Sequence, residues 1–217
     1  AAHELRTPLA MMQTKLELFT EEHSDVDAET SKLVQFQIDQ VDRLTSLVRT
    51  LLEMSNLQSV SRSDEIELAP LIDEILTDLT TLAEQKNITL HQNCEDVHMI
   101  GSDTLIYRLL FNLIENAIKY NHSGGSVTVS MQQENQQVLL HIADTGCGIP
   151  EEYRESIFQP FFRVDKSRSR QMGDVGLGLA LVREIAVLHG GSVCVESGSK
   201  DGTTFAVKLP LNGEKTE

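Results

Sequence analysis

Residues 103–121, DTLIYRLLFNLIENAIKYN, decide the fold of the larger part of the chain. Apolar residues recur here in pairs spaced by one helical turn, which is typical of a buried amphipathic α-helix. Asn112 and Asn116 are four residues apart, and Lys119 lies three further on, so the three polar groups share another face. The stretch therefore predicts a core helix over 103–121. The residues expected to point inward are Leu105, Ile106, Leu109, Leu110, Leu113, Ile114, Ala117 and Ile118.

Strand and helix patterns surround this helix. The sequence predicts helices over 69–86 and 176–189. It predicts strands over 88–94, 126–133, 138–144, 192–196 and 203–209. Helices interspersed with antiparallel hairpins favour an α+β class, with one mixed sheet that carries its helices on one face.

The first 60 residues carry a different pattern. Two apolar stripes at spacings of three and four residues predict a helical hairpin, with the connection at about residues 20–27. A Ser-rich stretch at 58–64 ends the period, so we expect domains at 1–62 and 63–217. Because so short a hairpin buries too little surface to be stable alone, dimerisation into a four-helix bundle is the simplest expectation. Packing of the hairpin on the rest of the chain is the alternative.

Composition excludes several classes of protein. The 217 residues carry a net charge of −15, which disfavours binding to nucleic acid phosphates. No apolar run approaches the roughly 18 residues of a membrane span, and no signal peptide is visible. Three scattered cysteines without a CxxC pair exclude a disulfide scaffold or a zinc ribbon.

Residues 3–9, HELRTPL, form the most unusual local string. A histidine beside a carboxylate is typical of a nucleophilic imidazole with a general base. Pro8 disturbs the helix near Glu4, which would expose this turn. The alternative is that Pro8 lies near a helix start and His3 is an ordinary surface residue.

Three further strings suggest a site for a phosphorylated ligand. Amide oxygens at Asn112 and Asn116 suit a hydrated Mg²⁺ that bridges phosphates, although a solvated helix face has the same spacing. Asp144, followed by closely spaced glycines, can accept from a ligand amine, although a tight turn looks similar. Glycines at 173–178 open a helix, which is typical of an anion site. The basic run 163–171 suggests a flap over a polyanion, and Phe158, Phe161 and Phe162 at its base are interpreted as core anchors.

The order of these strings resembles the sensor histidine kinases of two-component systems. It is similar over essentially the whole chain to their dimerisation and phosphoacceptor hairpin, followed by the Bergerat-type ATP-binding α/β sandwich shared with gyrase, Hsp90 and MutL. The resemblance implies autophosphorylation of a histidine by ATP and Mg²⁺, and phosphoryl transfer to an aspartate of a response regulator. It also implies a homodimer and phosphatase activity toward the same regulator. The net charge adds the expectation of no nucleic acid partner.

Residue roles follow from the same resemblance. His3 would be the phosphoacceptor and Glu4 its general base, and Glu4 with Thr7 would position water for dephosphorylation of the regulator. Asn116 would bind Mg²⁺. The remaining ATP-binding residues implied are Asn112, Lys119, Tyr120, Asp144, Gly146, Gly148, Ile149, Arg163, Gly176, Leu177, Gly178 and Thr203.

One residue departs from the family pattern, and two alternative functions remain open. Asp174 stands where the family commonly has glycine, within the expected ATP lid at about 163–175. The chain would be the cytoplasmic portion of a longer bacterial membrane sensor, and would meet the membrane only through an N-terminal part that lies outside this sequence. A non-catalytic nucleotide switch and an energy-transducing ATPase are the alternatives, and intact His3, Glu4, Asn116 and Asp144 disfavour the first.

Overall fold

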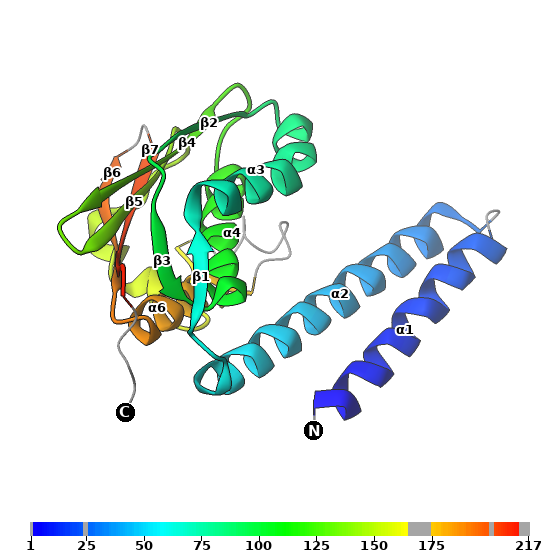
Figure 1. Cartoon of the computed structure of the whole chain (residues 1–217). Coiled ribbons are helices and arrows are strands. Elements are labelled where there is room, and N and C mark those ends of the chain that lie inside the picture. Colours follow the sequence, from blue (N-terminus) through cyan, green and yellow to red (C-terminus); the bar gives the residue numbers. More distant parts are fainter. Residues whose placement is uncertain (1, 24–25, 165–174, 200–201, 213–217) are drawn as a thin grey trace.

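The computed structural model describes residues 2–23, 26–164, 175–199 and 202–212, with the backbone alone for 2–6 and 199. A helical hairpin projects from an α/β unit (Figure 1). Its helices are α1 (Ala2–Glu22) and the longer α2 (Ala28–Asn56), which is followed by one 3-10 turn, η1 (Leu57–Ser59). The Asp27 carboxylate caps α2 and accepts from the amides of Glu29 and Thr30, each at 2.9 Å.

The two helices of the hairpin contact each other, but they do not cover their apolar stripes. Val41 is buried, whereas Met12 and Leu44, which the spacing placed in the seam, are 55% and 49% exposed. Phe36 and Leu51 are also exposed. One partner helix covers only one flank of a stripe this wide. The alternative that the hairpin lies along the rest of the chain is not observed, because only the end of α2 meets the α/β unit, where Leu57 enters its core.

The α/β unit is built on a five-stranded mixed sheet of order β2-β4-β5-β7-β6. Its strands are β2 (Thr89–Cys94), β4 (Ser126–Glu134), β5 (Gln137–Asp144), β6 (Ser192–Ser199) and β7 (Gly202–Pro210). β2 and β4 are parallel and the other pairs are antiparallel. Helices α3 (Leu68–Gln85), α4 (Asp103–Lys119) and α6 (Gly178–Leu188) cover one face, which confirms the predicted α+β layers (Figure 1).

A second, two-stranded sheet was not predicted. β1 (Asp64–Glu67) and β3 (His98–Gly101) pair antiparallel between the hairpin and the main sheet. Four residues are too few for an alternating pattern to stand out from the surrounding loops. Two short 3-10 turns, η2 (Glu151–Tyr153) and η3 (Ser156–Phe158), lead away from the end of β5.

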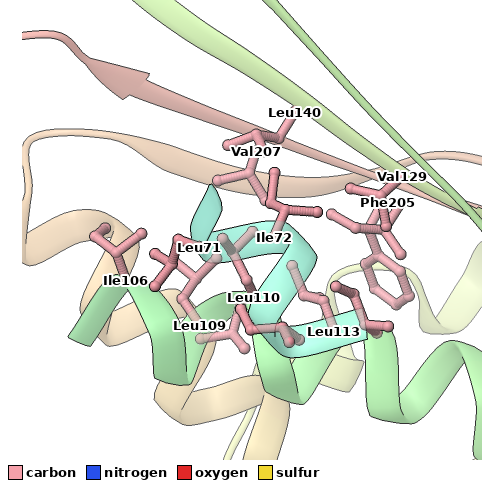
Figure 2. Close-up of a cluster of buried hydrophobic side chains, with 14 of the residues drawn as sticks. Leu71, Ile72, Ile106, Leu109, Leu110, Leu113, Val129, Leu140, Phe205 and Val207 are labelled. Carbon is pink, nitrogen blue, oxygen red and sulfur yellow. The ribbon is translucent and has the colours of Figure 1, made fainter. Parts of the chain in front are cut away.

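The core lies between the helices and the sheet (Figure 2). The inward residues of α4 are buried as the helical period predicts, and Ile106, Leu109, Leu110, Leu113, Ile114 and Ile118 are fully buried. They face sheet residues that include Val129, Leu140, Phe205 and Val207. Because α4 is fixed along its whole buried side, the end of the helix is held firmly beside the ends of the strands.

A buried histidine ties α4 to α6. His189 is 3% exposed; its Nε2 accepts from the amide of Ser102 at 3.1 Å, and its Nδ1 lies 2.8 Å from the carbonyl oxygen of Ile185. These partners require the neutral tautomer that carries its proton on Nδ1. Burial lowers the pKa of His189, which is consistent with a neutral ring.

An ion pair joins the hairpin to the α/β unit. The guanidinium of Arg108 on α4 binds both carboxylate oxygens of Glu53 near the end of α2, with Nη2–Oε1 at 2.5 Å and Nε–Oε2 at 3.3 Å. Both side chains are a little over one quarter exposed. Among the described residues, no helix is long and apolar enough to cross a bilayer.

Candidate functional site

A cavity of about 310 Å³ opens where the end of α4, the end of β5 and the start of α6 meet. The fold brings these ends together because α4 lies across β5, and α6 packs beside α4. Nine of the residues expected to bind a ligand line it, drawn from five separate stretches of the sequence. They are Asn116, Tyr120, Asp144, Gly148, Ile149, Arg163, Gly176, Gly178 and Thr203.

Asp144 is the acid at one end of this cavity. Its Oδ1 accepts from the backbone amides of Gly146 at 2.7 Å and Thr203 at 3.3 Å. Burial raises the pKa of Asp144, and the two amide hydrogen bonds partly oppose that rise. A carboxylate held in this way among apolar walls can accept an N–H from a ligand amine.

The backbone approaches Asp144 so closely that two neighbouring positions require glycine. A Cβ on Gly146 would lie 2.5 Å from the carbonyl oxygen of Tyr120. Gly202 has a φ of +136°, and a Cβ there would overlap the carbonyl oxygen of Asp144. These glycines therefore bring the end of α4 and the start of β7 up against Asp144.

Arg163 marks a positive end of the same cavity. Its Nε and Nη2 are buried, and neither has a hydrogen-bond partner within the described part of the chain. Buried N–H donors without a partner are costly, and an anionic ligand group would satisfy them. The first residues of α6, Gly178 and Leu179, line the cavity as well, so the amides that begin this helix add a positive dipole end.

Four predicted ligand residues lie outside the cavity lining. The side-chain amide of Asn112 donates to the carbonyl oxygen of Arg108 at 2.7 Å. Lys119 pairs with Glu115 at 2.9 Å, Leu177 is only 2% exposed, and Gly146 supports the backbone below Asp144. Asn112 still lies close to the site, because its Oδ1 would be 3.0 Å from a Cβ on Gly178.

The predicted catalytic residues lie on the hairpin. The backbone of His3 and Glu4 belongs to the first turns of α1, and their side chains lie outside the described part. Thr7 follows on the same helix and is exposed. Most of the expected lid, including Asp174, also lies outside the described residues.

The apolar walls of the cavity were largely missed by sequence reasoning. They include Cys147, Pro150, Ile157, Phe162, Val164, Leu179 and Phe205. Phe158 is a core residue as predicted and meets Phe205 edge-on at 6.3 Å, whereas Phe162 lines the cavity and Phe161 is 57% exposed. A pattern of apolar residues gives no signal that separates a cavity wall from a core.

The donor groups suit a metal ion that is held mainly by a ligand. The described residues contain no group of three or more His, Cys, Asp or Glu side chains arranged for a metal. Asn116 lines the cavity, and its side chain carries one amide oxygen. Mg²⁺ commonly keeps several waters and binds through one protein oxygen and phosphate groups, so this set fits it.

Comparisons with protein families cover both parts of the chain. Residues 101–213 match the model described as the histidine kinase-, DNA gyrase B- and HSP90-like ATPase, and residues 1–60 match the His Kinase A (phospho-acceptor) domain.

Two curated relatives are similar in sequence to nearly the whole of this chain. Sensor histidine kinase RppB of Synechocystis is 35% identical over 97% of the chain and 48% of its own length. Sensor histidine kinase WalK of Bacillus subtilis is 32% identical over 100% and 36%. The chain thus spans half or less of the length of these relatives.

Two solved structures are similar in fold and in sequence. The catalytic domain of histidine kinase ThkA has a TM-score of 0.62 and 28% identity, over 71% of this chain and all of that one. The structure of ThkA in complex with the response regulator protein TrrA has a TM-score of 0.70 and 27% identity, over 99% of this chain and 60% of that one.

Proposed function

Because the chain belongs to the sensor histidine kinases of two-component systems, we propose that it transfers the γ-phosphoryl group of ATP to His3 and then to an aspartate of a response regulator. The observation that carries this proposal is the cavity of the α/β unit, which places the partly buried carboxylate of Asp144 and two unpartnered guanidinium nitrogens of Arg163 on one ligand-sized space. Residues 1–62 would form the phosphoacceptor hairpin and residues 63–217 the ATP-binding domain.

ATP would bind with its adenine near Asp144 and its phosphates toward Arg163 and the start of α6. Asp144 would accept from the adenine amino group, with Thr203 supporting it and Tyr120 against the ring. Gly148 and Ile149 would lie along the base, and Gly176 and Gly178 would let the backbone approach the phosphates. Asn112, Lys119, Gly146 and Leu177 would act from beside the cavity.

Asn116 would hold Mg²⁺ together with the phosphates. When bound, this ion would neutralise charge that develops on the transferred group. The residues of this chain would position the nucleotide. Arg163 would hold the terminal phosphate, and Asp144 would hold the adenine.

In the proposed reaction the imidazole of His3 attacks the γ-phosphorus while the bond to the ADP oxygen breaks. Glu4 accepts the proton that the imidazole loses. The phosphoryl group then passes to the carboxylate of a response regulator docked on the hairpin. We also propose that the hairpin forms a homodimer, and that Glu4 and Thr7 together position water to dephosphorylate the same regulator.

The whole protein would be a membrane sensor whose cytoplasmic portion contains these residues. The names of the relatives support the sensor part of this proposal, since they are sensor histidine kinases of about twice this length or more.

Replacing His3 tests the proposal. His3→Gln keeps a polar side chain but removes the nucleophile, so we expect no acid-labile labelling from γ-³²P-ATP, while calorimetric ATP binding is unchanged. Asp144→Asn is the matched second variant, in which binding and labelling should both fall. Undiminished acid-labile labelling of His3→Gln would show that the phosphoacceptor is another residue.

The phosphatase activity is tested separately. When the chain is mixed with a phosphorylated regulator and ADP, the rate at which the regulator is dephosphorylated should be lower for Thr7→Ala than for the wild type.

A further inference from the structure

A cluster of hydrogen bonds joins the end of α4, the start of β4 and the end of β5, immediately behind the cavity. It consists of the side chains of Asn121 and Thr145 and the backbone of Ser126. We propose that Asn121 and Thr145 are positioning residues that set the width of the nucleotide pocket at its adenine end. The proposal rests on the proposed binding of ATP in this cavity.

Asn121 uses both atoms of its side-chain amide. Its Nδ2 donates to the carbonyl oxygen of Ser126 at 2.9 Å. Its Oδ1 accepts from the amide of His122 at 2.9 Å and from the hydroxyl of Thr145 at 3.2 Å. Because α4 ends at Lys119, this side chain fixes the chain at the point where the helix can no longer do so.

Thr145 completes the connection from the strand side. Its hydroxyl oxygen accepts from the amide of Ser126 at 2.9 Å, and its own amide donates to the carbonyl oxygen of Ser126 at 3.1 Å. The single hydroxyl proton has the shorter acceptor in Asn121, at 3.2 Å, compared with 3.4 Å to Ser126. Valine at this position would keep the shape of threonine and lose these hydroxyl bonds.

The cluster is packed so closely that the neighbouring position 125 has no room for a side chain. A Cβ on Gly125 would overlap Oδ1 of Asn121 and would lie 2.7 Å from Oγ1 of Thr145. The Tyr120 carbonyl oxygen also accepts from the amide of Cys147 at 3.3 Å. The end of α4 is thus held against the segment after β5 by side-chain and backbone bonds together.

The position of the cluster in the chain gives it a functional consequence. Asn121 directly follows Tyr120, and Thr145 directly follows Asp144, but neither Asn121 nor Thr145 lines the cavity. Tyr120 and Asp144 line the cavity from two segments that lie against each other, so a bond between their chain neighbours helps to fix the position of one segment relative to the other. A base that contacts both segments requires that relative position to be constant, because poorly held partners lose hydrogen-bond geometry.

Calorimetric titration of the 217-residue chain with ATP tests the proposal. We expect Thr145→Val to weaken ATP and ADP equally, by about fivefold to tenfold, as the loss of one or two hydrogen bonds implies. Thr145→Ser keeps the hydroxyl and should restore affinity to within about twofold of the wild type. Because the phosphate end is untouched, the labelling rate at saturating ATP should stay near that of the wild type while the KM for ATP rises.

A second variant and a control separate this effect from a general loss of stability. Asn121→Ala should weaken ATP binding at least as much, and the double variant should lose less than the sum of the two single variants, because both remove the bond between the two side chains. Thr77→Val removes a hydroxyl on α3 that donates to the Asp73 carbonyl oxygen, far from the cavity, and should leave the KM unchanged. If Asn121→Ala does not fold, Thr145→Val and Thr145→Ser decide.

The outcomes distinguish this inference from the proposed function. Wild-type affinity in folded Thr145→Val, or a loss in Thr145→Ser as large as that in Thr145→Val, overturns the positioning role while ATP binding by the wild type stands. Failure of the wild-type chain itself to bind ATP would overturn the proposed function on which the inference rests.

Discussion

Asp144 is subject to two opposing influences on its charge. Burial favours the neutral acid and raises its pKa, whereas the amides of Gly146 and Thr203 favour the carboxylate. In its proposed role the charged form is the useful one, since a carboxylate is the stronger acceptor for an adenine amino group.

We predict that ATP affinity falls as pH is lowered from neutrality. Because the pKa of Asp144 is raised above its ordinary value of 3.8, the carboxylate takes up its proton at a higher pH than an exposed aspartate does, and the loss of affinity begins correspondingly higher. Asp144→Asn should bind about tenfold or more weakly at neutral pH and should lose this component of the pH dependence. Calorimetry over a pH series measures both; Asp96→Asn, at an exposed carboxylate, is the control. Identical pH profiles for Asp144→Asn and the wild type would contradict the prediction.

Single residues of the cavity differ in how far the sequence predicted them. Asp144, Gly148 and Gly178 belong to strings of unusual composition, and each of them lines the cavity. Phe162 and Phe205 lack such a signal, because an apolar side chain has the same pattern whether it meets a ligand or another side chain. Arg163 was expected at the phosphates. The burial of two of its nitrogens without a hydrogen-bond partner could not be predicted from the sequence, because it depends on the folded surroundings.

At the scale of elements, the antiparallel helices α4 and α6 form the floor of the nucleotide site. Asn112 of α4 lies beside Gly178 at one end of the pair, and His189 joins the opposite ends through Ser102 and Ile185. The helical period predicted both helices to within a few residues, because each buries a long apolar side. The role of His189 was not predicted, since its partners are far away in the sequence.

We predict that His189 makes the stability of the fold depend on pH. The unfolded chain binds a proton at this residue near its ordinary pKa of 6.5, whereas burial lowers the pKa in the folded chain. Its contribution is therefore complete above pH 6.5 and is lost as pH falls from 6.5 toward the lowered value. Urea unfolding at several pH values should show a falling free energy of unfolding over this range.

Variants of two histidines test the assignment. His189→Ala should lower the free energy of unfolding by about 2–4 kcal/mol at neutral pH, through a cavity and an unsatisfied Ser102 amide, and should flatten the pH dependence. His98→Gln, at a half-exposed position, should change neither. An unchanged slope in His189→Ala would assign the pH dependence to other groups.

At the scale of the whole molecule, the hairpin is incomplete as a single chain. Met11, Met12, Leu33, Phe36, Leu44 and Leu51 are exposed by 43% to 59% on its two helices. Large apolar side chains left exposed in this number on two paired helices are typical of an interface. The hairpin was predictable from its seam and β1 and β3 were not, because a long period accumulates signal and a four-residue strand does not.

We predict that Leu44→Glu converts a dimer into a monomer. A charge at the centre of the exposed stripe would have to be desolvated in a four-helix bundle, which opposes association. Sedimentation equilibrium should give twice the chain mass for the wild type and 24.2 kDa for the variant. Ser46→Glu adds the same charge at an exposed polar position of α2 and should remain dimeric. A wild-type chain that is monomeric at micromolar concentration would contradict the expected bundle.

The ion pair between Glu53 and Arg108 has a consequence for the whole molecule in solutions of different ionic strength. It is the bidentate charge contact that connects α2 to α4, and both partners remain partly open to water. Dissolved salt screens such charges over about 10 Å at 0.1 M, so the attraction weakens as salt concentration rises. The contribution of this ion pair to the attachment of the hairpin to the α/β unit is therefore smallest in concentrated salt. Ionic strength thus acts on the contact between the hairpin that carries His3 and the unit that would bind ATP.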